Sequence, residues 1–258
     1  MATEKDLLTS RIIFQAVLPV IKVMLEDDPK MKQRFQGVAA TVQFVAKDPA
    51  GPVGGYIRFG ADGFSSGQGL VENPDLTFCF SSVAKMNAMF AGKPVLPWIK
   101  GLTKVGLLVK VFSVLLGMKI LMPTAKPKKP EMARMKVKMT LYMVSTALSQ
   151  LNKSGDPDMV KWTSKQPERV YQWSVDGEDI GCWLMVKAGK TKAGRGFYTR
   201  RKPFVHMRFA SVDDALPVLS NSVDTVQAMA KGMVVNDGSP EYGGKIGDFM
   251  LKIAALVT

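Results

Sequence analysis

The stretch PDLTFCFSSV at residues 74–83 decides the fold, because it returns in outline as PFVHMRFASV at residues 203–212, displaced by 129 positions. In the first copy Leu76, Phe78 and Phe80 alternate with other residues. Successive side chains of a β-strand point to opposite faces of a sheet, so this alternation predicts one face on a core and one toward water. A serine follows the strand in both copies and is the expected N-cap of a helix. The chain therefore contains a predicted strand-then-helix unit twice.

The similarity between the two halves continues upstream of these stretches. Each half carries a strand-like block with a central glutamine, Gln43 in the first and Gln172 in the second. An apolar block with an aromatic residue and a glycine-bearing turn follow in both halves. The aligned segments are residues 41–44 with 170–173, 55–59 with 182–186, and 66–69 with 193–196, displaced by 127 to 129 positions. This nearly constant displacement predicts two copies of one unit, each with four short strands in meander order.

A helix is expected before each predicted sheet. In the first copy it covers residues 3–28, with a bend at Pro19, because proline lacks the N–H that a helix interior needs. In the second copy an apolar stripe recurs every three or four residues. The stripe consists of Val137, Leu141, Val144, Leu148 and Leu151. Residues 124–130, rich in lysine and proline, suit an exposed linker between the copies.

The order of these features resembles the sterol carrier protein 2 (sterol-binding) family. The features are an amphipathic helix, a Val-Gln-Phe or Tyr-Gln-Trp strand, a Gly-x-Gly turn, and a strand running into a serine-capped helix that ends near Gly92-Lys93. The resemblance covers residues 35–122 and 160–257. It implies an α+β fold of two tandem sterol-carrier-like domains, each a five-stranded, mainly antiparallel sheet covered by helices that enclose an apolar cavity. The expected boundaries are 1–123 for the first domain, 124–130 for the linker and 131–258 for the second domain.

The two copies differ after their fourth strands. Residues 232–236 of the second copy suit the fifth strand, and residues 245–257 suit the closing helix. The first copy has no clear fifth strand after Trp98 and continues into residues 101–122, a long apolar helix with a narrow polar side. Lysines within it disfavour a transmembrane span, because a charge near the bilayer centre is costly. A buried core helix and a cavity-lining or membrane-dipping helix are both open interpretations.

The resemblance implies non-catalytic binding and intracellular transfer of a hydrophobic ligand, either a fatty acyl chain, a sterol or a phospholipid, with no cofactor. The 17 methionines suit a core with variable contents, although a methionine-rich core is the plainer interpretation. Inward residues of the strands are the expected cavity floors, and the later helices are the expected lids. The floor residues are Ile57, Phe59, Phe78, Phe80, Leu184, Val186, Val205, Met207 and Phe209. The lid residues are Leu108, Phe112, Leu115, Phe249, Met250 and Ile253. Core packing alone would use the same residues.

Residues that carry catalytic chemistry are sparse. The only histidine, His206, is expected on the outward face of its strand. Cys79 and Cys182 are too few for a disulfide framework and form no C-x-x-C pair, which suits a reducing compartment, the cytoplasm. The run Gly189-Lys190-Thr191 lacks the upstream glycine of a phosphate-binding loop. We therefore expect neither an enzyme nor a metal site.

The net charge of +13 favours anionic partners, either membrane head groups or nucleic acid. Its densest part is a run of basic residues interleaved with Phe197 and Tyr198. The run comprises Lys187, Lys190, Lys192, Arg195, Arg200, Arg201 and Lys202. Three interpretations stay open, in this order: a solvated strand edge, docking on an anionic membrane, and binding of single-stranded nucleic acid.

The leading hypothesis is a lipid carrier that contacts an anionic membrane surface transiently, with nucleic acid not expected as a partner. The main alternative is a structural module in which the two copies pack as a pseudo-dimer and fill each other's cavities. A nucleic-acid binder that uses the basic strand edge is the weaker alternative.

Overall fold

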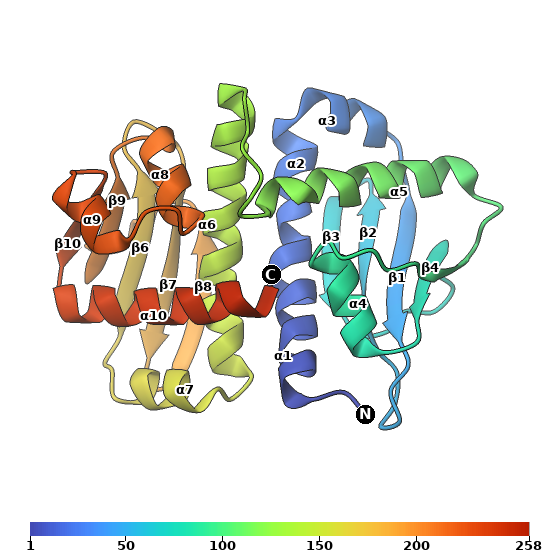
Figure 1. Ribbon diagram of the computed structural model, residues 1–258, viewed down its shortest axis with the longest axis horizontal. Helices are drawn as coiled ribbons and strands as arrows, with labels where there is room; N and C mark the ends of the chain where they lie inside the picture. Colours follow the sequence, from blue (N-terminus) through green and yellow to red (C-terminus); the bar gives the residue numbers. More distant parts are fainter. Residues whose placement is uncertain (258) are drawn as a thin grey trace. The chain divides into compact units, whose positions relative to one another are not determined.

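In the computed structural model, which describes residues 1–257, the chain divides into two compact units. Unit 1 comprises Met1–Lys119 together with the C-terminal residues from Leu256, and unit 2 comprises Ile120–Ala255. Each is an α+β unit with one five-stranded mixed sheet and covering helices (Figure 1).

Unit 1 begins with helices and continues into its sheet. The first helices are α1 (Glu4–Ile12), η1 (Ile13–Val17), η2 (Leu18–Val20), α2 (Ile21–Asp27) and α3 (Pro29–Phe35). The strands are β1 (Ala40–Ala46), β2 (Val53–Gly60), β3 (Gly63–Gln68), β4 (Leu76–Phe80) and β5 (Trp98–Lys100). The later helices are α4 (Val83–Phe90), α5 (Val105–Gly117) and η3 (Met118–Leu121), which ends in unit 2.

The N-terminal helices form one continuous stretch with an irregular middle. Thr3 and Asp6 cap its start by exchanging hydrogen bonds in a capping box. Near Pro19 the α-helix gives way to π and 3-10 turns, because proline offers no N–H to the helix. By length and composition Glu4–Asp27 could cross a membrane, but 61% of its apolar window is buried, and core helices and signal sequences pass the same test. Phe14 and Leu18 lie in the core of unit 1, as expected of a core helix.

The sheet of unit 1 has the strand order β3-β2-β1-β4-β5. The pairs β1–β2, β2–β3 and β4–β5 are antiparallel, whereas β1 and β4 run parallel. The predicted meander is therefore right for β1, β2 and β3 but wrong for β4, which pairs on the other side of β1. The sheet is therefore mixed. The sequence pattern did not predict this, because alternation along a strand fixes its two faces and says nothing of its neighbours.

A fifth strand is present in unit 1, as the resemblance implied, although the sequence shows no clear strand after Trp98. β5 has only three residues and pairs with β4, with Trp98 opposite Cys79 and Ile99 opposite Phe78. A strand this short, directly after Pro97, offers no alternation to recognise in the sequence. The long apolar helix α5 follows this strand instead of replacing it.

Unit 2 has the same strand arrangement. Its helices are α6 (Pro130–Lys153), α7 (Pro157–Ser164), α8 (Val212–Leu219), α9 (Thr225–Ala230) and α10 (Pro240–Val257). Its strands are β6 (Arg169–Val175), β7 (Gly181–Lys187), β8 (Lys190–Arg195), β9 (Val205–Phe209) and β10 (Val234–Gly238). The order is β10-β9-β6-β7-β8, with β6 and β9 parallel and the other pairs antiparallel. The predicted meander is wrong for β9 for the same reason as for β4.

A buried glutamine holds a loop against the sheet in both units. The side-chain oxygen Oε1 of Gln43 accepts a hydrogen bond from the N–H of Val71 at 2.7 Å. The Oε1 atom of Gln172 accepts one from the N–H of Tyr198 at 2.8 Å. In each unit the held loop is the one before the strand that runs parallel to the glutamine's own strand. The sequence alignment of the two glutamines thus corresponds to an equivalent structural position.

An aromatic ring also covers a glycine at the same place in both sheets. Tyr56 is paired with Gly67 across β2 and β3, and Trp183 is paired with Gly194 across β7 and β8. A Cβ atom on Gly67 would lie 2.7 Å from the hydroxyl oxygen of Tyr56, and one on Gly194 would lie 2.1 Å from the ring of Trp183. Only glycine leaves room for these rings on the neighbouring strand.

In unit 1 the helices cover one face of the sheet (Figure 1). Phe14 of η1, Met86 of α4 and Val111 of α5 belong to one core cluster with the inward residues of β1, β2 and β4. In unit 2, α6 is bound to β7, because the Sγ atom of Cys182 donates a hydrogen bond to the carbonyl of Leu141 at 3.3 Å. The five residues of the apolar stripe predicted on this helix are all buried.

The start of the predicted linker is tied to α6 by a buried lysine. Lys136 is only 5% exposed, and its Nζ atom donates to the carbonyls of Met122 and Ala125 at 2.9 and 2.6 Å. Burial lowers the pKa of Lys136. Backbone carbonyls in place of a carboxylate thus hold this ammonium group.

Candidate ligand-binding site

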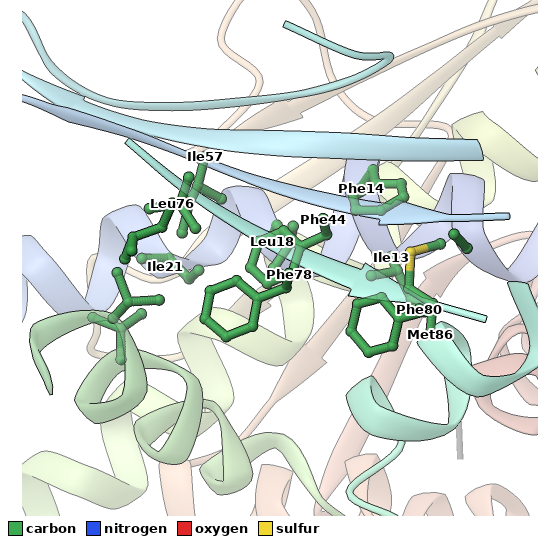
Figure 2. Close-up of a cluster of buried hydrophobic side chains, with 14 of the residues drawn as sticks. Ile13, Phe14, Leu18, Ile21, Phe44, Ile57, Leu76, Phe78, Phe80 and Met86 are labelled. Carbon is green, nitrogen blue, oxygen red and sulfur yellow. The ribbon is translucent and has the colours of Figure 1, made fainter. Parts of the chain in front are cut away.

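The inward face of the unit 1 sheet is a packed apolar layer. Figure 2 shows side chains from the N-terminal helices, the strands and α4 meeting there. The rings of Phe44 and Phe78 stack with their centroids 5.2 Å apart. All four expected floor residues of this unit lie in the cluster, and none is more than 4% exposed. They are Ile57, Phe59, Phe78 and Phe80. The structure brings them together, but with side chains filling the space between them.

Helix α5 covers this layer with one of its two apolar sides. Val111 and Val114 are fully buried in the cluster, and Leu108 and Leu115, two of the expected lid residues, are half-buried against it. Phe112, the third, is 40% exposed, although its ring still meets that of Phe78 edge-on at 5.8 Å. α5 therefore lies over the expected floor, with Phe112 at the edge of the contact.

Small residues let α5 approach the N-terminal helices closely. A Cβ atom on Gly117 would lie 2.7 Å from the sulfur of Met24. The hydroxyl of Ser113 donates to the carbonyl of Lys110 at 2.6 Å and lies 4.0 Å from the sulfur of Met31. Methionine adapts its shape to its neighbours more readily than a branched side chain. This side of α5 thus rests on side chains that can rearrange.

A pocket of about 420 Å³ opens in unit 1 where β1 and α5 begin. Its lining residues are Val38, Ala39, Ala40, Asp75, Lys104, Gly106, Leu107 and Lys110. Lys104 makes an ion pair with Asp75, whose other carboxylate oxygen accepts a hydrogen bond from the N–H of Thr41 at 2.7 Å. These two contacts, with that of Lys104 the larger, hold the pKa of Asp75 below its usual range. The pocket combines an apolar wall with the Asp75–Lys104 ion pair and with Lys110, a set that suits a ligand with an apolar body and an acidic end.

The inward face of the unit 2 sheet is equally filled. The expected floor residues Leu184, Val186, Val205, Met207 and Phe209 are all buried. Of the expected lid residues on α10, Phe249 and Ile253 are buried and Met250 is half-buried. A chain of aromatic rings with centroids 5.3 to 6.3 Å apart occupies this layer. It consists of Trp162, Tyr171, Phe204, Tyr242 and Phe249.

Arg169 stands among these rings and is a residue that the sequence analysis missed. Its guanidinium carbon lies 4.0 Å from the ring centroid of Phe204 and 4.4 Å from that of Tyr242. Its Nη1 atom is buried without a hydrogen-bond partner. Alternation along β6 gives Arg169 the same face as Tyr171 and Trp173, so a charged residue on an inward face was the signal available in the sequence.

The described residues contain no group of three or more histidine, cysteine, aspartate or glutamate side chains that could hold a metal ion. The Nε2 atom of His206 lies 2.8 Å from the hydroxyl of Ser174 and 3.1 Å from the amide nitrogen of Gln172. Burial is the main cause that lowers the pKa of His206. Cys182 is fully buried, and burial raises the pKa of its thiol to about 12, so it stays protonated and unreactive at neutral pH.

The basic run of unit 2 is partly neutralised. Glu168 makes ion pairs with Lys187 at 2.9 Å and with Arg201. These contacts lower the pKa of Glu168. Arg195 lies over the ring of Tyr142, with its guanidinium carbon 5.1 Å from the centroid. These contacts fit the interpretation of a solvated strand edge.

The similar solved structures include a sterol carrier protein 2-like protein. The chain is similar to palmitated sterol carrier protein 2-like 2 from Aedes aegypti, with 14% identity, a TM-score of 0.30, and coverage of 42% of this chain and 90% of that one. It is similar to a crystal structure of the same protein, with 15% identity, a TM-score of 0.30, and coverage of 43% and 97%.

A sec-alkylsulfatase from Pseudomonas sp. is also similar, with 11% identity, a TM-score of 0.26, and coverage of 55% of this chain and 28% of that one. No protein-family model and no curated protein matches the sequence. At these identities and TM-scores, function has to be argued from the chain's own residues.

Proposed function

We propose that the chain binds a single-tailed amphipathic lipid reversibly in unit 1 and transfers it, without catalysis. The observation that carries the proposal is the pocket of about 420 Å³ at the start of α5, where apolar residues and two lysines meet. This volume lies within the range of ordinary small-molecule sites. The acidic end of a fatty acid would lie at Lys110, because Lys104 is already paired with Asp75, and its chain would enter between α5 and the sheet.

Entry of the chain requires α5 to move, because the layer beneath it is packed. An outward shift of α5 would uncover Val111 and Val114, and the lipid chain would take their place against Phe78. Each Å² of apolar surface that the lipid buries contributes about 25 cal/mol, which offsets the lost contacts. The contacts of α5 with Met24 and Met31 adapt to such a shift at little cost. The proposed location is the cytoplasm.

The experiment is a titration with a fluorescent fatty acid, followed by displacement with palmitate. Gly106 lines the pocket, and a Cβ atom there would meet nothing within 4 Å. We expect Gly106→Phe to weaken fatty-acid binding roughly tenfold or more, because the new ring would occupy space in the pocket that the ligand needs. Gly247→Phe in α10 is the matched control, because Gly247 is also helical and unobstructed, and it should bind like the parent. Equal binding by the parent and both variants would show that the fatty acid does not bind at this pocket of unit 1.

A second function, a structural module with filled interiors, is favoured by one observation. The aromatic residues around Arg169 occupy the inward layer of unit 2 and leave its side chains in mutual contact. If parent protein shows no saturable binding at all, this module becomes the better account of the chain.

A further inference from the structure

The exposed side of α5 carries an uninterrupted apolar row, of which Phe112 also touches the edge of the core. Val105, Val109, Phe112 and Leu116 follow one another at intervals of four, three and four residues, which places them on one side of the helix. They are 61%, 62%, 40% and 58% exposed. We call these four residues the outer stripe. A helix that only closed a core would carry polar residues at these positions.

The segment that carries the outer stripe has only basic charged residues. Residues 76–119 contain six lysines and no aspartate or glutamate. Lys104 makes an ion pair with Asp75. Lys119 follows the last turn of α5 and is exposed. Lys110, within α5, is half-buried. Lysines therefore outnumber carboxylates around the apolar row, with Asp75 paired to Lys104.

This combination selects among the surfaces that could cover the stripe. A second copy of the chain would bring two lysine-bearing helices together across a two-fold axis, which repulsion between like charges disfavours. An acidic protein would match the charge, but the stripe offers no hydrogen-bonding group to specify it. An anionic bilayer supplies both an apolar layer and negative head groups, without needing directional contacts.

We propose that the outer stripe docks unit 1 onto anionic lipid bilayers, with α5 parallel to the membrane and the surrounding lysines among the head groups. This docking goes beyond the proposed carrier function, because it needs no ligand inside the protein. It would also place the pocket beside Gly106 close to the membrane surface.

The test is co-sedimentation of the full chain with vesicles of phosphatidylcholine alone and of phosphatidylcholine with phosphatidylserine. The parent should bind only the phosphatidylserine vesicles, and added salt should weaken this binding. Val109→Asp and Val105→Asp should each weaken it roughly tenfold, because apolar burial is lost and a charge repelled by the surface is added. Both valines are exposed, so circular dichroism and thermal unfolding should match those of the parent.

The matched control is Val226→Asp in α9, where a valine is 74% exposed outside the stripe. It should bind the anionic vesicles like the parent. Equal binding by the Val109→Asp and Val226→Asp variants, or binding to phosphatidylcholine alone, would overturn the proposal. A parent that does not bind, or that is a dimer separated by Val109→Asp, would overturn it too. If Gly106→Phe does not affect fatty-acid binding, only the proposed carrier function is contradicted, and the docking proposal stands.

Discussion

At the residue scale, buried polar side chains fix the two sheets more specifically than the apolar ones. Gln43 and Gln172 each accept a hydrogen bond from the backbone N–H of a loop. Any apolar residue of suitable size would fill a core position, but only a long amide at these points bonds that loop. The two glutamines therefore mark the repeat better than the Phe, Met and Val residues around them.

His206 makes one residue-scale prediction about pH. Its pKa is lowered in the folded chain, mainly by burial, while Arg208 beside it is paired with Asp176 and Asp237. A depressed folded pKa means that the stability contributed by the neutral ring is present above the unfolded pKa and is lost as pH falls through the folded value. The free energy of unfolding of unit 2 should thus fall as pH drops from about 7 to about 5.

The measurement is urea unfolding followed by tryptophan fluorescence in a Trp98→Phe background, which leaves the three tryptophans of unit 2 as reporters. The His206→Gln variant should lose part of the pH dependence, since His206 is the only histidine in the chain. If the free energy of unfolding depends on pH in the same way in both proteins, His206 does not contribute to that dependence.

At the element scale, helix α5 is the part of the fold in which neighbouring residues have opposite roles. Val111 is fully buried and Val109 is 62% exposed, two positions away. Val111→Asp should destabilise unit 1 by roughly 2–4 kcal/mol, because it buries a charge in the apolar layer. Val109→Asp should change stability by less than about 0.5 kcal/mol, as surface substitutions do.

Thermal and urea unfolding of both variants, followed by circular dichroism, measures this difference. Similar losses in the two variants would mean that α5 is buried all round, and the outer stripe would then be no docking surface. Similar stability in both would mean that α5 does not close the core.

The elements also show what sequence reasoning can and cannot recover. Alternation found β4 and β9, and the two serines after them cap α4 and α8 as expected, at Ser82 and Ser211. The sequence did not predict the parallel pairing of β1 with β4, because strand order depends on contacts between distant segments. β5 was not predicted because a strand of three residues is too short to show alternation.

The candidate site could be predicted only in part. Apolar alternation identified Phe78 and Phe80 as inward residues, and both are buried. It could not tell a cavity floor from a packed core, because both use the same side chains. The pocket at Gly106 and Lys110 lies where a loop, a strand and a helix meet, a place that no local pattern marks.

At the scale of the whole molecule, two units of the same topology differ in what their inward layers hold. Unit 1 has a pocket beside a helix that is apolar on two sides. Unit 2 has aromatic rings and the guanidinium group of Arg169, whose Nη1 atom is buried. The two copies have therefore diverged in the side chains that fill them.

The most direct test of lipid carriage is mass spectrometry of the purified chain under native conditions, before and after incubation with fatty acids, a sterol and a phospholipid. The proposed function predicts one lipid bound per chain at saturation, with a fatty acid displacing any lipid retained through purification. Neither retention nor saturable uptake of any lipid in the panel would contradict it.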